Sequence, residues 1–205
     1  MKKYWITLLK MFVFLLVLFA TMRIVFLIKY WSLVMLGEIP FGEIIKGFWA
    51  ALPLDVATAS FMLAIPAIYM FVALLVDKDT LFAPLRWYFY LIVAVYNLVA
   101  FGDIGIYGEW RTKLSYRALM YLQNPSEVIN TAETEQTLLL IVLWTFFTIL
   151  FCWLYTKFVE PKELALNREE SRPNKLILFG SFVLVVGILF LGMRGGLNEI
   201  PITSS

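Results

Sequence analysis

Long apolar runs separated by short polar segments dominate the pattern of residues along the chain. A helix needs about 20 residues to cross about 30 Å of hydrocarbon, and inside lipid each run must be helical because no water satisfies the backbone. Five runs are long enough, and they cover residues 5–28, 48–76, 87–106, 137–158 and 176–193. The pattern therefore predicts an all-α, polytopic membrane domain with five transmembrane helices over residues 1–193.

Prolines and glycines inside these runs indicate where the helices begin, bend or pack. Proline suits the first turn of a helix, where its missing N–H is no loss, so we expect the second helix to begin near Pro53, with residues 48–51 at the membrane interface. Pro66 falls in the middle of that span and is expected to kink it. Gly180 and Gly187 are seven residues apart on one face of the fifth run, which favours close helix packing there.

Lysine and arginine residues beside the runs indicate the orientation of the chain. More of them fall on the inside when the N-terminus is placed in the cytoplasm, which favours that orientation. An odd number of spans then puts the C-terminus outside. Residues 108–136 become an outer segment, whose part 114–122 mixes Arg117 with apolar and aromatic side chains. That mixture fits either a short interfacial helix or an ordinary connecting loop.

Composition narrows the functional classes. The chain is 61% hydrophobic and 16% charged, whereas soluble domains are about half apolar and a quarter charged. A net charge of +2 without a basic stripe gives no reason to expect a nucleic-acid partner. There is no histidine, no glycine-rich phosphate loop and only one cysteine, Cys152, while the acidic residues are scattered. We therefore expect neither a catalytic site nor a metal site in this chain alone.

Arg23 and Asp55 are ionisable residues inside the apolar runs, where a charge is costly and therefore a functional candidate. Arg23 lies eight residues, about 12 Å, before Trp31. Asp55 lies six residues, about 9 Å, after Trp49. The two depths match, so we hypothesise a structural ion pair between Arg23 and Asp55. As an alternative, Asp55 would complement the N-terminus of a helix that begins at Pro53.

Three further charged residues lie near span ends on the outer side. Asp103 is sixteen residues, about 24 Å, beyond Trp87, Arg111 follows the third run, and Arg194 ends the fifth. Arginine binds phosphate through two parallel hydrogen bonds, so Asp103, Arg111 and Arg194 are a hypothetical site for a phospholipid headgroup. The alternatives are a structural or snorkelling role for Asp103 and an interfacial anchor for Arg194.

Two stretches resemble a known family. One is residues 97–128, "NLVAFGDIGIYGEWRTKLSYRALMYLQNPSEV", and the other is residues 193–205, "MRGGLNEIPITSS". Both are similar to the membrane domain of the lipoteichoic acid synthase family, including its members classed as sulfatases. The resemblance implies five spans with the C-terminus outside. It also implies that residues 194–205 begin a linker to a missing extracytoplasmic domain of the alkaline phosphatase and sulfatase superfamily.

The family resemblance also implies a function. In that family the extracytoplasmic domain holds a threonine nucleophile and a divalent metal, manganese or magnesium, and it transfers phosphoglycerol or phosphoethanolamine from a phospholipid. No position here matches those catalytic residues. The expectation is therefore a membrane anchor in the bacterial cytoplasmic membrane, with a phospholipid and the C-terminal catalytic domain as partners. The parent protein would be a phosphotransferase or a sulfatase-like hydrolase.

A small transporter subunit or a non-catalytic membrane adaptor is the alternative to this expectation. Transporters tend to place polar groups at the membrane midplane between inverted repeats. The charges in this sequence are displaced toward one side, and five spans do not divide into equal halves. The sequence therefore favours the anchor over the transporter.

Overall fold

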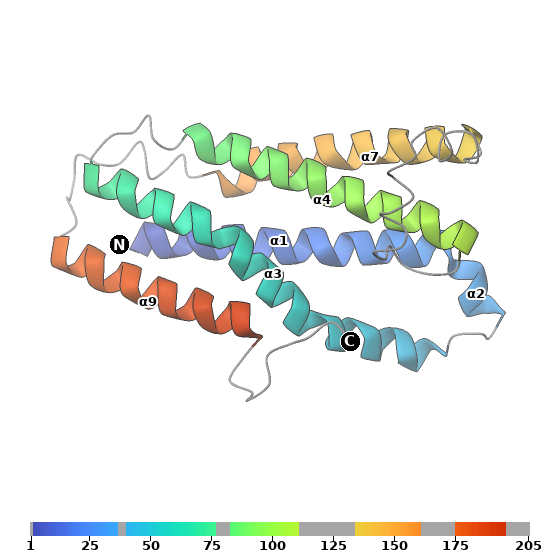
Figure 1. The fold of residues 1–205 in the computed structure, drawn as a ribbon, viewed down its shortest axis with the longest axis horizontal. Helices are drawn as coiled ribbons and strands as arrows, with labels where there is room; N and C mark the ends of the chain where they lie inside the picture. Colours follow the sequence, from blue (N-terminus) through green and yellow to red (C-terminus); the bar gives the residue numbers. More distant parts are fainter. Residues whose placement is uncertain (1, 37–39, 77–82, 111–133, 161–174, 196–205) are drawn as a thin grey trace. The chain divides into compact units, whose positions relative to one another are not determined.

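The computed structural model describes residues 2–36, 40–76, 83–110, 134–160 and 175–195, and almost all of them are helical. The elements are α1 (Lys2–Lys29), α2 (Trp31–Met35), α3 (Phe41–Val76), α4 (Ala83–Trp110), α7 (Thr134–Leu154), the π-helix η2 (Tyr155–Val159) and α9 (Lys175–Arg194) (Figure 1). Within these residues, five stretches are long and apolar enough to cross a membrane: Tyr4–Lys29, Phe41–Val76, Pro84–Gly108, Glu135–Val159 and Leu176–Arg194. The predicted five-span helical fold is confirmed at this level, while the orientation stays a prediction.

The surfaces of these helices are rich in exposed large apolar side chains. Trp87 is 71% exposed on α4, Phe179 is 60% exposed on α9, and Phe61 is 62% exposed on α3. Lipid tails are as apolar as such side chains, so this exposure suits helices surrounded by a bilayer. The chain is a multi-pass membrane protein.

Contacts divide the chain into two compact units. Unit 1 comprises residues 1–87 and 155–205, and therefore holds α1, α2, α3, η2 and α9. Unit 2 comprises residues 88–154, which are most of α4 and all of α7.

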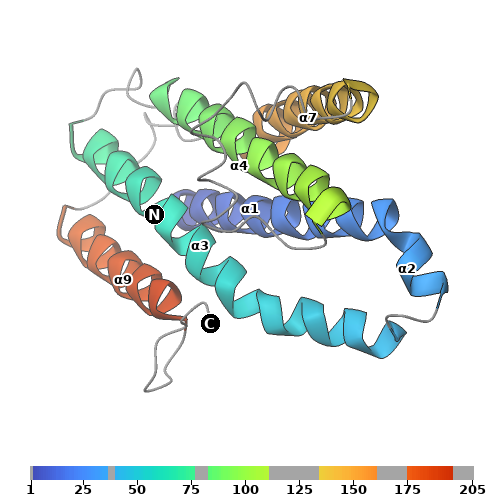
Figure 2. The same ribbon diagram turned by 45° about the vertical axis from the view of Figure 1, so that its right-hand side comes forward.

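In unit 1, α3 is the helix that contacts both α1 and α9 (Figures 1 and 2). Its buried face is rich in small side chains, among them Ala57, Ala59, Ser60, Ala67 and Ala73. Small side chains let membrane helices approach closely without a hydrophobic driving force. The Tyr4 hydroxyl of α1 donates to the Ala67 carbonyl at 3.4 Å. On the side of α9, the Phe71 and Phe182 rings stack with centroids 4.0 Å apart.

The start of α3 differs from the prediction. The helix begins at Phe41 and runs for 36 residues, so Pro53 and Pro66 both lie inside it. The helix opens directly after Pro40, whose carbonyl accepts from the Glu43 N–H at 2.9 Å. The rule that proline suits a helix start was sound, but it applied to Pro40. Interior prolines cost a backbone hydrogen bond and are accommodated by bending, and Figures 1 and 2 show α3 as a bent helix.

The other spans also extend beyond the apolar runs. α4 begins four residues before the predicted position 87 and ends four residues after 106. The fourth span continues from α7 into η2, where the Glu160 N–H donates to the Tyr155 carbonyl at 2.9 Å, five residues back. The predicted interfacial segment 114–122 and most of the predicted linker, residues 196–205, lie outside the described residues.

In unit 2, polar side chains join α4 and α7 near the middle of both helices. The Trp144 indole N–H donates to the Ala94 carbonyl at 3.0 Å. The Asn97 amide nitrogen donates to the Thr148 hydroxyl at 3.4 Å, and Asn97 is fully buried. Hydrogen bonds of this kind hold membrane helices together where lipid offers no polar partner.

Candidate functional site

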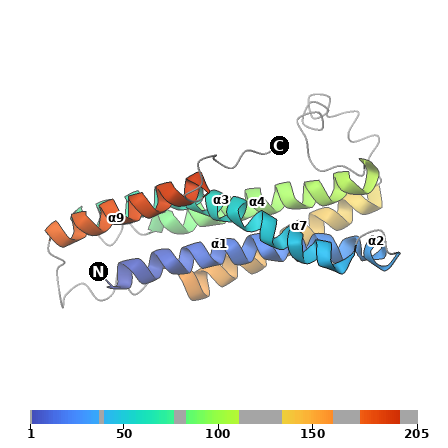
Figure 3. The same cartoon turned by 90° about the horizontal axis from the view of Figure 1, so that it is seen from below.

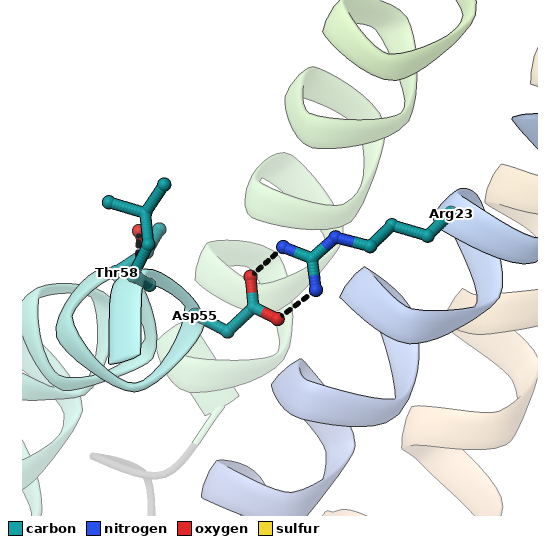
Figure 4. A network of polar contacts seen from close by, with 4 residues as sticks. Arg23, Asp55 and Thr58 are labelled. Carbon is teal, nitrogen blue, oxygen red and sulfur yellow. Dashed lines mark hydrogen bonds and ion pairs between the residues drawn. The ribbon is translucent and has the colours of Figure 1, made fainter. Parts of the chain in front are cut away.

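Arg23 on α1 and Asp55 on α3 form a bidentate ion pair (Figure 4). Nη2 of Arg23 donates to Oδ1 of Asp55 at 2.5 Å, and Nη1 donates to Oδ2. The Asp55 side chain is 12% exposed and the Arg23 side chain is 30% exposed. The structure therefore contains the ion pair that the matched depths of the two residues predicted. Two parallel charge-assisted hydrogen bonds make this a strong and directional contact.

The alternative role of Asp55, as a complement to a helix N-terminus, is wrong. It required a helix that begins at Pro53, whereas Asp55 lies fourteen residues after the first residue of α3, Phe41. The favourable interaction of an anion with the helix dipole is confined to the first turn. The charge of Asp55 is therefore balanced by Arg23.

Hydroxyl groups next to Asp55 bond to their own helix. The Thr58 hydroxyl donates to the Leu54 carbonyl at 2.8 Å, and the Ser60 hydroxyl donates to the Val56 carbonyl at 2.7 Å (Figure 4 shows Thr58 on the same part of α3 as Asp55). Such back-bonding satisfies a hydroxyl in an apolar setting, and it also bends helices slightly. These hydroxyls therefore add to the bending that the prolines favour in α3.

α9 approaches α3 closely at Gly192. A Cβ atom at Gly192 would overlap the Ser60 hydroxyl and would lie 3.1 Å from the Ser60 Cβ and 3.8 Å from Val56 Cγ1. By contrast, a Cβ at Gly180 or Gly187 would meet nothing within 4 Å among the described residues. The face shared by Gly180 and Gly187 therefore does not pack against α3, and close packing through these two glycines stays a prediction.

Arg194 is the last residue of α9, two residues after Gly192, and it is exposed. Gly195 follows with a positive φ of 82° and donates its N–H to the Gly192 carbonyl at 2.9 Å, which ends the helix as a C-terminal glycine typically does. Since Gly192 packs beside Val56 and Ser60, α9 ends level with the part of α3 that carries Asp55. We call Arg23, Asp55 and Arg194 the charged end of unit 1.

The charged end lies at the edge of the hydrocarbon by residue count. About 20 residues suffice to cross the bilayer core, and twenty residues counted back from Val76 along α3 reach Ala57. α9 ends at the same level of α3, where Gly192 contacts it. Asp55 is two residues beyond Ala57, so a span counted from Val76 would place the ion pair near the boundary between hydrocarbon and headgroups.

The predicted headgroup residues are not gathered within one unit. Asp103 is half-buried on α4 in unit 2, Arg194 belongs to unit 1, and Arg111 lies outside the described residues. The pocket of Asp103, Arg111 and Arg194 therefore stays a prediction. Within the described parts of the chain, no group of three or more histidine, cysteine, aspartate or glutamate residues could hold a metal ion.

A second ion pair in unit 1 was not predicted. Nε of Arg86 donates to Oε1 of Glu160 at 2.6 Å, and Nη2 of Arg86 contacts the same oxygen. Arg86 lies in the first turn of α4, and Glu160 directly follows η2. The two residues are 74 positions apart in polar stretches of the chain, so the sequence carried no signal of their pairing.

These features define the class of the protein: a multi-pass α-helical membrane protein with an ion pair near one end of its larger unit. No family model, curated protein or solved structure matches the chain. The likeness of residues 97–128 and 193–205 to the lipoteichoic acid synthase family therefore stays a prediction.

Proposed function

We propose that the chain is the membrane anchor of a phosphoglycerol or phosphoethanolamine transferase in the bacterial cytoplasmic membrane. The anchor positions a catalytic domain of the alkaline phosphatase and sulfatase superfamily at the outer leaflet and presents a phospholipid headgroup to it. That domain, and not this chain, would hold the manganese or magnesium ion. The proposal is supported by the two motif resemblances and by one structural observation, the charged end of unit 1.

The charged end supports the proposal through its net charge. Asp55 neutralises Arg23 in a bidentate pair, whereas the exposed Arg194 has no ion-pair partner among the described residues and would contribute a positive charge at the level of the headgroups. Lys29, the last residue of α1, is a second exposed cation beyond Arg23. A guanidinium in that position matches the geometry of a lipid phosphate. Because the chain continues from Arg194 toward the linker, a bound headgroup would lie close to the start of the catalytic domain.

An anchor of this kind acts through effective concentration. A tether at the membrane surface raises the effective concentration of the lipid donor near the catalytic domain. It does so without adding any contact between the domain and the lipid. The ion pair Arg23–Asp55 would serve this role by fixing α1 to α3 beside the end of α9.

Lipid retention tests the headgroup part of the proposal. We expect the protein, purified in mild detergent and studied by native mass spectrometry, to retain phosphatidylglycerol or phosphatidylethanolamine in preference to phosphatidylcholine. The double variant Arg111→Ala and Arg194→Ala should weaken retention about tenfold, the equivalent of one charge-assisted hydrogen bond. Lys157→Ala is the matched control, since Lys157 is an exposed cation on η2, which packs on α1 through Tyr155 and Phe14. Unchanged lipid retention in the double variant would contradict the proposed headgroup pocket.

The transferase part needs its own test. Membranes from cells that express the natural gene should transfer radiolabelled phosphoglycerol or phosphoethanolamine from a labelled lipid when Mn²⁺ or Mg²⁺ is present. Absence of any transfer, with lipid retention intact, would contradict the transferase assignment and leave the lipid site standing.

A further inference from the structure

The first twelve residues of α3, residues 41–52, are surplus to the membrane crossing. α3 has 36 residues and would be about 54 Å long if straight, whereas the hydrocarbon core is about 30 Å thick. Residues 57–76 already supply the twenty residues required, and α9 ends at their outer limit. We call residues 41–52 the amphipathic segment, for the reason given next.

The amphipathic segment has one apolar face and one polar face. At 100° per residue, Phe41, Ile45, Trp49 and Leu52 fall within an arc of about 80°. Their side chains are 64%, 49%, 71% and 40% exposed, in that order. The other side of the helix carries the ion pair of Glu43 and Lys46, with Nζ of Lys46 2.7 Å from Oε1 of Glu43.

The apolar face of the segment continues the buried face of α3. On a regular helix, Phe41, Ile45 and Trp49 share their arc with Leu63 and Ala67, which are 2% and 1% exposed. The face is covered in the spanning part of α3, which contacts α1 and α9, and it is exposed in residues 41–52, beyond the level at which α9 ends. Figures 1, 2 and 3 show the segment in cyan, at the end of α3 that follows α2.

Two placements of the segment conflict with its side chains. If it projected straight into water, it would leave a contiguous apolar face with two large aromatic rings in contact with solvent. If it lay in the hydrocarbon, Glu43 and Lys46 would be taken out of water. Pro53 directly follows the segment and provides the point at which the helix can bend. Trp49 is also the residue type that is enriched at membrane interfaces.

We propose that the amphipathic segment is a membrane-surface helix, whose apolar face rests in the boundary between headgroups and acyl chains of the bilayer that the protein spans. α2, which precedes the segment in the chain, also exposes large apolar side chains: Trp31 and Met35 are 46% and 74% exposed at positions one turn apart. Glu43 and Lys46 cancel in charge, so the contact depends on apolar insertion and needs no anionic lipid. The inference stands apart from the proposed transferase function.

Site-directed spin labelling of the full chain in lipid bilayers tests this placement. The background variant is Cys152→Ser, and labels are introduced one at a time at Phe41→Cys, Ile45→Cys and Trp49→Cys on the apolar face. Gly47→Cys and Ala50→Cys report the opposite face, where both residues are exposed. Accessibility to oxygen, which concentrates in lipid, is compared with accessibility to a water-soluble nickel chelate.

The expected result is an alternation between the two faces. The apolar-face labels should be accessible to oxygen, and the opposite-face labels should be accessible to the nickel chelate. The depth difference between positions 41 and 49 should stay well below the about 12 Å of a helix along the membrane normal. Control labels at Phe61→Cys and Ile68→Cys, in the spanning part of α3, should instead differ in depth by about 10 Å.

Three results would overturn the proposal. Nickel accessibility on both faces would place the segment in water, and a depth gradient of about 1.5 Å per residue would make it part of the span. Protection of the apolar face from both reagents would show that protein, such as a second copy of the chain, covers it.

Discussion

Removing the Arg23 side chain while Asp55 stays in place is expected to destabilise the protein by about 2–3 kcal/mol. Breaking a fully buried ion pair by deleting one partner costs about 3–5 kcal/mol, mainly because the remaining charge is left without a partner. Asp55 is 12% exposed and Arg23 is 30% exposed, so water reaches part of the site and lowers the cost.

A double-mutant cycle separates the pair from the packing of each side chain. The variants are Arg23→Ala, Asp55→Ala and the combination of both. We expect a coupling free energy of about 2 kcal/mol, so the double variant should be more stable than the sum of the two single losses implies. The free energy of unfolding is measured in mixed micelles by SDS titration, with tryptophan fluorescence as the signal.

The exposed pair of Glu43 and Lys46 provides a matched control cycle. Their side chains are 58% and 75% exposed, and they are three residues apart on one helix, so their coupling should be only about 0.3–0.5 kcal/mol. If the losses of unfolding free energy for Arg23→Ala and Asp55→Ala simply add, the reasoning is refuted. The coupling free energy would then be zero, and the ion pair would not stabilise the protein. A coupling at 43 and 46 as large as that at 23 and 55 would show that burial is not what strengthens the pair.

Three further variants test other contacts by the same unfolding assay. Gly192→Ala should cost about 1–2 kcal/mol, because its Cβ would meet Ser60, whereas Gly187→Ala should cost nearly nothing; equal losses would contradict the close approach at residue 192. Trp144→Phe should cost about 0.6–1 kcal/mol, since it deletes the hydrogen bond from the indole to α4, and an unchanged midpoint would show that the bond contributes nothing. Glu160→Gln should cost about 0.5–1 kcal/mol, since its arginine partner is 44% exposed; a loss above 3 kcal/mol would indicate a deeper pair than the structure shows.

The number of spans was predictable because a bilayer allows a spanning segment few backbone conformations. A run of twenty apolar residues can satisfy its backbone in lipid only as a helix, so length and composition sufficed. The helix ends were less predictable, as the start of α3 at Phe41 shows. The turns around Glu43 and Lys46 are helical but amphipathic, so their average polarity hides them from a search for apolar runs.

The ion pair was predictable for a similar reason, whereas the packing contacts were not. A charge inside a span must find a partner at its own depth, and residue counts give depth directly. Glycine spacing gives only the face that two glycines share, and it does not say which face meets a neighbour; hence Gly192 was missed in favour of Gly180 and Gly187. Asn97, which is fully buried in the structure, was missed as well. An asparagine in the middle of an apolar run is a signal that the sequence does contain.

The position of the Arg23–Asp55 pair has a mechanical consequence for α3. Pro53 has no N–H to donate to the preceding turn, so the helix is weakened just before Asp55. At that point α1 holds α3 through two charge-assisted hydrogen bonds, and α9 holds it through the contact of Gly192 with Ser60. A bend that is fixed from two sides can set the direction in which residues 41–52 leave the spanning part. If residues 41–52 lie on the membrane surface as we propose, the ion pair predicted from the sequence would therefore also fix the direction in which α3 meets that surface.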